Sequence, residues 1–425
     1  MNVYKVEAFD VWNFLFSLAH CPQMVRWRGD FDGFIDLDTL GQAVEASYKA
    51  MPLIAARFVD GLLRPAWRPR TVALDEVLQL VERPAEPEAA AQAALAVDVD
   101  IAQGPQLRLT VIRQDDHDTL CAVVNHMLCD GVGFKDYLAE LSRLYSQIAA
   151  GRQPDPLPPL PRGIGPVAAR YTPSERLHIA LGRMEQFNRQ AIDAAGAVSF
   201  ERPDGPDQFI VKTVPAAVFE PARLGAKALG GTVNDLLMAA FARAWCAETG
   251  ACRMALPSTV DLRAFLPPGQ RPALAHLAGN CMVALEIPPG QPLADTLQQV
   301  SSQMAVHKQG IAPLRTALKW PIATTTCPYP LLKRNYGSFL NLPGVSFSNI
   351  GVIDPEKIAF AGLALTASHL CTAVKPPPYF QLVATSFQGS LTLSANLRGD
   401  GQAAVLALRV FQAMADEFAT LKPPS

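Results

Sequence analysis

A histidine followed four residues later by an aspartate and then a glycine is the arrangement with the clearest chemistry in this chain. His126 follows an apolar, strand-like stretch, and Asp130 and Gly131 precede a segment with the pattern of a helix. Histidine changes charge near neutral pH, which makes it the usual general base. An aspartate and a glycine just after it indicate a turn whose buried carboxylate holds the loop in one shape. We therefore expect His126 to move a proton.

The spacing His-x-x-x-Asp-Gly resembles the motif of the chloramphenicol acetyltransferase superfamily, which includes plant acyltransferases, wax ester synthases, polyketide-associated acyltransferases and the condensation domains of nonribosomal peptide synthetases. Chance alone gives such a match in roughly 2–3% of comparable chains. Four further segments resemble the superfamily in its own order: 231–240, 260–263, 279–280 and 346–351. This common order strengthens the resemblance.

The resemblance implies catalytic roles for the motif and a partner for its carboxylate. His126 would be the base, Asp130 and Gly131 would complete the motif, and Arg263 would pair with Asp130. A free carboxylate would raise the proton affinity of the neighbouring histidine, whereas a paired one leaves that pKa near neutral. A bidentate arginine–carboxylate pair would also fix the loop. The alternative for Arg263 is a solvated residue after a strand.

The resemblance further implies a set of residues that line a substrate tunnel: Asn125, Asn280, Ser346, Ser348 and Asn349. For Asn280, Ser348 and Asn349 the alternative is a turn or cap residue. Backbone N–H groups near 131–132, or Ser348 and Asn349, are candidate donors to a tetrahedral oxyanion.

One position departs from the condensation domains. Asn125 stands where those domains carry the first of two adjacent histidines. Chloramphenicol acetyltransferase and the plant acyltransferases keep only the second histidine, so we expect catalysis to survive. The departure leaves open whether the chain belongs to the peptide-bond-forming subgroup.

Other chemistries find less support in the sequence. Cys129 could form a nucleophilic pair with His126, but no third group orients it. The remaining histidines lack clustered acidic or cysteine partners, so we expect no metal site. No glycine-rich phosphate-binding loop occurs, so no nucleotide cofactor is indicated.

Composition places the chain among well-packed globular proteins. Of its residues, 49% are hydrophobic and 18% are charged. Its length of 425 residues is enough for two domains. The net charge of -2 and the absence of a dense Lys/Arg run argue against nucleic acid or an anionic membrane surface as the main partner. No apolar stretch is long enough to span a membrane. Eight cysteines without Cys-x-x-Cys spacing, and no signal-peptide pattern, predict reduced thiols in a cytoplasmic protein.

Strand and helix patterns alternate in both halves of the chain. The predicted strands cover residues 23–27, 64–70, 72–74, 106–113, 119–125, 209–214, 254–260, 280–287, 345–350 and 358–369, with a hairpin over 379–397. The predicted helices cover 39–58, 87–95, 134–148, 173–195, 232–250, 293–309 and 401–421, with another from 221. A Pro/Gly-rich linker covers 151–166.

This alternation predicts a mixed α/β fold of two similar layered subdomains. We divide it into an N-terminal subdomain (1–165) with the motif, a linker and bridging helix (166–200) and a C-terminal subdomain (201–425). The resemblance implies a V-shaped pseudo-dimer, with donor and acceptor entering from opposite faces. Because both halves lie in one chain, we expect a monomer.

The leading hypothesis is an acyltransferase of secondary metabolism. It would transfer an acyl group from a thioester of coenzyme A or of an acyl or peptidyl carrier protein, acting in trans, to a small amine or alcohol. The donor's phosphopantetheine arm would be the only cofactor, and none would be tightly bound. The alternatives are an acyl-CoA:alcohol O-acyltransferase of the wax ester type and a catalytically idle domain that docks carrier proteins.

Overall fold

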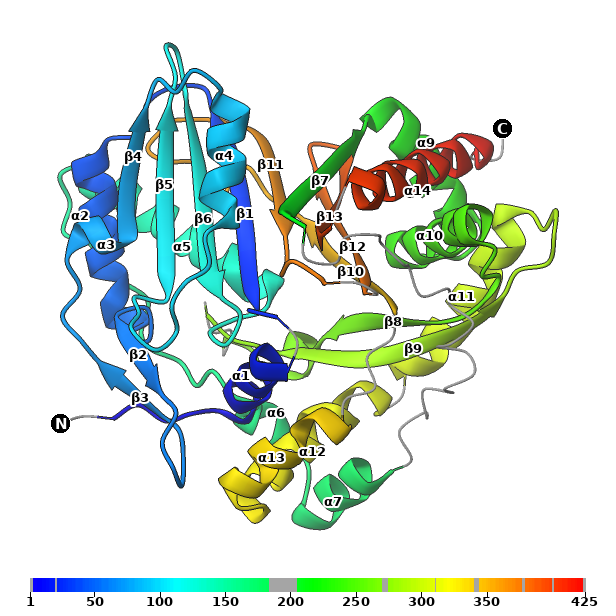
Figure 1. The fold of residues 1–425 in the computed structure, drawn as a ribbon, viewed down its shortest axis with the longest axis horizontal. Helices are drawn as coiled ribbons and strands as arrows, with labels where there is room; N and C mark the ends of the chain where they lie inside the picture. The colour runs from blue at the N-terminus through cyan, green and yellow to red at the C-terminus, as the bar shows by residue number, and fades with distance from the viewer. Residues whose placement is uncertain are drawn as a thin grey trace.

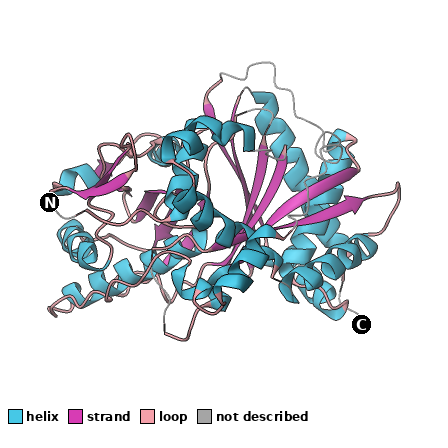
Figure 2. Ribbon diagram, turned by 90° about the horizontal axis from the view of Figure 1, so that it is seen from below, coloured by secondary structure: helices cyan, strands magenta, loops and turns pink. Residues whose placement is uncertain are grey.

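A computed structural model describes residues 3–19, 21–182, 205–269, 274–309, 311–339, 344–376, 379–399 and 401–422. Two halves, each built on its own sheet, lie side by side in it (Figure 1). The labelled ends of the chain lie at opposite sides of the molecule, both in Figure 1 and in the view from below (Figure 2). The expected α/β architecture of two subdomains is therefore confirmed.

Five strands form the sheet of the first half. Their order is β11 (Leu365–Cys371), β1 (Met24–Phe31), β6 (Asp118–Asn125), β5 (Leu107–Arg113) and β4 (Leu78–Glu82). All neighbours are antiparallel except β4 and β5. Every residue of the central strand β6 is buried, so the segment after β6 starts from the interior of the protein.

Helices cover both faces of this sheet. On one face α5 (Gly131–Ala149) packs against α2 (Leu37–Ala50), and α4 (Pro87–Ala96) lies on the other. Side chains of a strand alternate between its faces, and β6 accordingly directs Leu120 towards α5 and Cys121 towards α4.

Four strands form the sheet of the second half. Their order is β10 (Val345–Val352), β12 (Phe380–Phe387), β13 (Ser390–Arg398) and β7 (Asp207–Val214). Three helices pack on it and on one another: α9 (Ala216–Ala228), α10 (Val233–Thr249) and α14 (Gly401–Thr420). Helix α10 begins with a capping box between Thr232 and Asp235.

Two connections join the halves. Strand β11 follows the second half's β10 in the chain but pairs with β1 of the first sheet. The hairpin of β8 (Arg253–Asp261) and β9 (Ala278–Glu286) runs beneath both halves in Figure 1. A short 3-10 helix, Leu262–Phe265, follows β8. This hairpin therefore carries residues of the second half under the first sheet.

The remaining elements lie around this frame. They are α1 (Ala8–Ala19), β2 (Ala56–Val59), β3 (Ala66–Pro69), α3 (Leu74–Val77), α6 (Gly165–Ala168), α7 (Pro173–Leu181), α11 (Leu293–Gln309), α12 (Ala312–Thr326) and α13 (Tyr329–Phe339). No helix among the described residues has the length and apolar composition that crossing a membrane requires.

Several sequence-based boundaries are wrong. The helix expected over 39–58 ends at Ala50, because Pro52 removes a backbone donor and disfavours helical backbone at the residue before it. The strand expected over 72–74 does not form: residues 72–73 have no regular secondary structure, and α3 begins at Leu74 and is followed by β4. The strand expected over 358–369 begins only at Leu365, after a turn with positive φ at Ala361 and Gly362.

The expectation that all eight cysteines are reduced is also wrong. Cys246 and Cys252 form a disulfide with a Cα–Cα distance of 4.6 Å. The left-handed backbone at Gly250 ends α10 and turns the chain back, so Cys252 returns to the last turn of that helix. The other six cysteines form no disulfide with a described residue.

The bridging segment is described only in part. Helix α7 covers the start of the helix expected over 173–195, and the remainder of that range beyond residue 182 lies outside the described residues. The division of the chain at residues 165 and 200 therefore stays a prediction.

Candidate active site

The motif loop begins where the central strand β6 ends. The backbone N–H of His126 donates to the carbonyl of Gln23 at 3.0 Å. The side chain of the buried Asn125 donates to Gln106 Oε1 at 2.8 Å and accepts from the N–H of Met127 at 3.0 Å. Asn125, which we expected to line the tunnel, therefore shapes the turn that presents His126.

His126 combines a partly exposed side chain with a buried Nδ1. That atom has no hydrogen-bond partner among the described residues. Burial lowers the pKa of His126 from its ordinary value; Asp130 opposes this shift and Lys375 adds to it. The imidazole is therefore neutral at pH 7, which is the form that accepts a proton. Because Nδ1 is buried, Nε2 is the nitrogen left to meet a substrate.

A second histidine lies beside the first. The ring centroids of His126 and His276 are 5.1 Å apart, and the ring centroids of His276 and Phe9 of α1 are 4.6 Å apart. Burial, followed by the proximity of His126, lowers the pKa of His276 to about 3. His276 is therefore an uncharged side chain that packs beside His126 in the site. Sequence reasoning missed it, because no spacing links it to the motif.

Asp130 begins α5 and carries the predicted ion pair. Its side chain accepts from the N–H of Gly133 at 2.8 Å. Arg263 donates to both carboxylate oxygens, with Nη1 3.0 Å from Oδ2 and Nη2 2.9 Å from Oδ1. Burial alone would raise the pKa of Asp130, but Arg263 more than offsets it, and the pKa is lowered. The structure thus brings Asp130 and Arg263 together as a buried pair, and Arg263 is not a solvated residue.

This ion pair also holds the segment that carries His276. The N–H of Leu277 donates to Asp130 Oδ2 at 2.7 Å, and the carbonyl of Ala275 accepts from Arg263 Nη2 at 2.8 Å. The N–H of Asp130 donates to the same carbonyl at 3.2 Å. Both neighbours of His276 are therefore bonded to the pair, which fixes His276 across from His126.

Two glycines let other chain segments approach the start of α5. A Cβ atom at Gly133 would lie 2.6 Å from the carbonyl oxygen of Ala275, and one at Gly131 would lie 2.8 Å from Ile350 Cδ1. Lys135 of the same helix donates to the carbonyls of Ile350 (2.6 Å) and Val352 (2.9 Å). The predicted motif residue Gly131 therefore sits where the first half touches β10 of the second.

The other residues that we expected to line a tunnel lie on two strands of the second half. Asn280 is exposed on β9, opposite Thr259. Ser346 and Ser348 are partly exposed on the same face of β10. The Oδ1 of Asn349 accepts from the N–H of Gly351 at 2.9 Å, at an irregularity in the pairing of β10 with β12. Their contact with a substrate stays a prediction.

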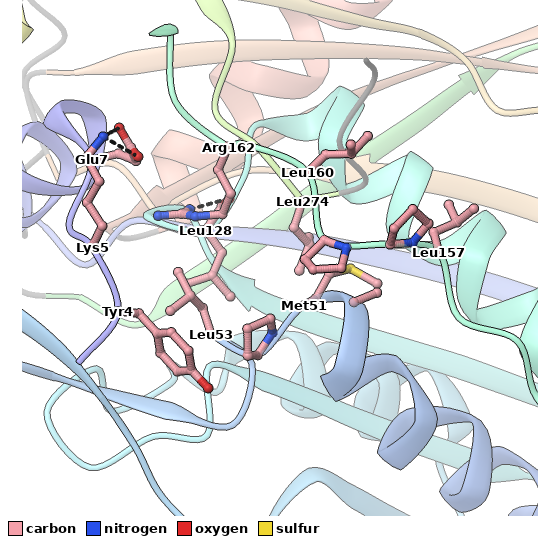
Figure 3. Close-up of a pocket in the computed structure, with 14 residues that line it drawn as sticks. Tyr4, Lys5, Glu7, Met51, Leu53, Leu128, Leu157, Leu160, Arg162 and Leu274 are labelled. Atoms are coloured by element: carbon pink, nitrogen blue, oxygen red, sulfur yellow. Dashed lines mark hydrogen bonds and ion pairs between the residues drawn. The ribbon is translucent and has the colours of Figure 1, made fainter. Parts of the chain in front are cut away.

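A largely apolar cavity of about 210 Å³ lies behind the motif loop (Figure 3). Leu128 of the loop and Leu274 of the His276 segment both line it. Residues 157–160 of the proline-rich stretch close another side. This stretch has no regular secondary structure, as expected of a linker, but it packs against the site rather than leaving it.

Arg162 fastens the proline-rich stretch to the motif loop. It donates to the carbonyl of Leu128 at 3.1 Å and forms an ion pair of 2.5 Å with Asp10. Asp10 also accepts from Trp67 Nε1 at 2.9 Å. The N-terminal helix, the small sheet and the motif loop thus share one buried polar network.

Cys129 does not have the surroundings of a nucleophile. The residue is fully buried in the core of the first half, and burial raises the pKa of its thiol well above the ordinary value. A nucleophilic cysteine needs a thiolate, which a desolvated apolar site disfavours. Across the described part of the chain, no cluster of three or more His, Cys, Asp or Glu side chains could hold a metal ion.

We predict that Cys129→Ala leaves the turnover number unchanged, since the neutral thiol takes no part in the reaction. Steady-state kinetics of the purified variant would test this. A loss of turnover equal to that of a His126 variant, without loss of folded structure, would instead show covalent catalysis through sulfur.

No family model matches the chain, and no curated protein matches its sequence. Solved structures do match it in fold. One is polyketide synthase associated protein 5 from Mycobacterium tuberculosis (TM-score 0.67, 15% identity, 100% of this chain and 98% of that one). Another is a mutant starter condensation domain of rhizomide synthetase in complex with C8-CoA and Leu-SNAC (TM-score 0.69, 14% identity, 99% and 96%).

A third is TRI3 trichothecene 15-O-acetyltransferase from Fusarium sporotrichioides (TM-score 0.73, 12% identity, 97% and 95%). Each similarity extends over nearly the whole chain, so both halves and their arrangement are shared. At this level of identity the comparisons establish the fold. The chain has the chloramphenicol acetyltransferase-like fold of condensation domains and polyketide-associated acyltransferases, as its motif predicted.

Proposed function

We propose that the protein is an acyltransferase that passes an acyl group from a thioester to an amine or an alcohol. The observation that carries this proposal is a neutral, partly exposed His126 on a loop fixed by the buried Asp130–Arg263 pair. The structural neighbours, which include condensation domains and an O-acetyltransferase, support an acyltransferase-like function.

The chemistry of the site follows from the state of its groups. Nε2 of His126 would take the proton of the acceptor's hydroxyl or amine as the acceptor attacks the thioester carbonyl. The tetrahedral oxyanion would then collapse, and the departing sulfur would receive that proton from the imidazolium. Asp130 serves only to order the loop, because its carboxylate is already bonded to Arg263 and to two backbone N–H groups.

The proposed donor carries phosphopantetheine, either in coenzyme A or on an acyl or peptidyl carrier protein that acts in trans. The complex of the rhizomide synthetase domain with C8-CoA and Leu-SNAC supports a donor of this class. The O-acetyltransferase among the neighbours supports an ester product as well as an amide. We place the reaction in secondary metabolism and expect the protein to act as a monomer without a tightly bound cofactor.

A substrate screen tests the proposal. Acyl-CoA and acyl-carrier donors are offered to a panel of amines and alcohols, and products are identified by intact mass. Transfer products that need the folded protein support an acyltransferase. A protein that binds carrier proteins tightly but forms no product with any pair would instead be a docking domain.

The pH dependence of kcat/KM should report the lowered pKa of His126. A protonated imidazole cannot accept a proton, so activity should fall as the pH drops through this pKa, with a midpoint below the ordinary value of 6.5. Because the charge of Lys375 adds to the lowering, Lys375→Met should move the midpoint to higher pH. A midpoint above 6.5 in the unmodified protein, or a shift of the variant to lower pH, would contradict this assignment.

A further inference from the structure

The hairpin of β2 and β3 carries an unusual tip. Leu62 and Leu63, at the turn between the strands, are 86% and 75% exposed, the two most exposed large apolar side chains in the described part of the chain. Figure 1 shows the loop that joins β2 and β3 projecting away from the body of the molecule at its lower left. Two adjacent leucines are thus held out into solvent.

The hairpin that carries these leucines also carries positive charge without an ion-pair partner among the described residues. Arg57 and Arg68 are exposed and lie directly opposite each other in the pairing of the two strands, and Arg64 follows the leucines. Like charges directly opposite each other are unfavourable, and none of these three arginines forms an ion pair with a described residue. The hairpin's one acidic residue, Asp60, is occupied by ion pairing with Lys333.

The inner face of the hairpin is firmly anchored. Phe58 and Trp67 are buried and pack edge to face with ring centroids 5.0 Å apart. Trp67 also bonds to Asp10, and Phe58 contacts the ring of Phe14 in α1 at 4.7 Å. Because the base of the hairpin is packed against the protein, the tip stays exposed.

We propose that this tip docks the protein onto an anionic lipid surface. Leu62 and Leu63 enter the headgroup layer, while Arg57, Arg64 and Arg68 contact lipid phosphates. A stable protein partner needs about 800 Å² of matching surface on each side, and a tip of two leucines supplies little of that area. A projecting apolar tip on a hairpin that carries three exposed arginines fits a lipid surface better.

This proposal departs from the expectation drawn from charge alone. The sequence has no dense basic run, but the pairing of β2 with β3 places Arg57 opposite Arg68 on the hairpin whose loop carries Arg64. The proposal does not depend on the proposed acyl transfer, because the hairpin residues Leu62, Leu63, Arg57, Arg64 and Arg68 lie outside the candidate active site.

Co-sedimentation with vesicles tests the proposal. The full chain should bind vesicles of equal parts phosphatidylcholine and phosphatidylglycerol, should bind phosphatidylcholine alone much more weakly, and should lose affinity as salt is raised. Leu62→Ser with Leu63→Ser should weaken binding at least about tenfold. Arg57→Gln with Arg68→Gln should weaken it about 20- to 30-fold.

The matched control replaces two exposed leucines of the second half, Leu229→Ser at the end of α9 with Leu408→Ser on α14, and should bind as the unmodified protein does. All variants should keep the same thermal midpoint, because the exchanged side chains are exposed. Failure of the unmodified protein to bind mixed vesicles, or equal binding by the hairpin variants, would overturn the proposal. A third result would also overturn it: the unmodified protein binds an acidic carrier protein but not vesicles, and the hairpin variants lose affinity for that carrier protein.

Discussion

Replacing His126 by alanine is expected to lower the turnover number by a factor of about 10²–10⁴, the usual contribution of a positioned general base. The ring is neutral, and Nδ1 is buried, which leaves Nε2 as the nitrogen that accepts the proton. The measurement is kcat for acyl transfer with the best donor and acceptor pair from the screen. KM should change less than kcat, since the ring acts in the transition state.

A matched control removes a histidine far from the site. His117 lies in the turn between β5 and β6, where it contacts Asp116 and Gln114. His117→Ala should leave kcat unchanged, which separates the loss of the base from a general effect of losing a histidine. Unchanged turnover in the His126 variant would show that the site works without this base and would leave the carrier-docking alternative.

Breaking the buried ion pair should have the largest effect on stability. Asp130→Asn and Arg263→Met should each lower the free energy of unfolding by about 3–5 kcal/mol, because each removes one partner of a buried ion pair, although Arg263 keeps its contact of 3.1 Å with the more exposed Asp261 in the first variant. The double variant should lose less than the sum, since the two residues form one network. Chemical unfolding followed by tryptophan fluorescence measures this. Each single variant should also lower turnover, because the pair holds both the motif loop and the His276 segment.

An exposed ion pair provides the control. Arg253 and Glu286 lie opposite each other on β8 and β9 with most of their side chains in solvent. Replacing them by Met and Gln should leave unfolding nearly unchanged. If the Asp130 and Arg263 variants behave unlike each other, the assignment of a shared structural role to the pair is wrong.

The local pattern was enough to predict the motif loop and its supports. The apolar run before His126 and the periodic run after Gly131 predicted β6 and α5, because a buried strand and an amphipathic helix have distinct spacings. The partner of Asp130 came from a resemblance in segment order, and the structure places Arg263 there. These features could be predicted because they depend on residues close together in the sequence or on a segment order that the superfamily shares.

Contacts between distant segments could not be predicted in the same way. His276 meets His126 only because the β8–β9 hairpin passes beneath the first sheet. Arg162 reaches the motif loop from a stretch whose prolines predict only an irregular linker. Strand β11 joins a sheet whose other strands lie in the first third of the chain. Such placements depend on tertiary packing, which the spacing of residue types does not encode.

The most direct test of the account follows single turnovers by intact mass. Purified protein, a thioester donor and an acceptor are mixed, and the masses of the product and the protein are recorded together for the unmodified chain and for His126→Ala. The account predicts an acyl–acceptor product in the unmodified protein, its near loss in the variant, and no acyl adduct on the protein at any time. An adduct that forms and decays, or product formation at the same rate without His126, would contradict it.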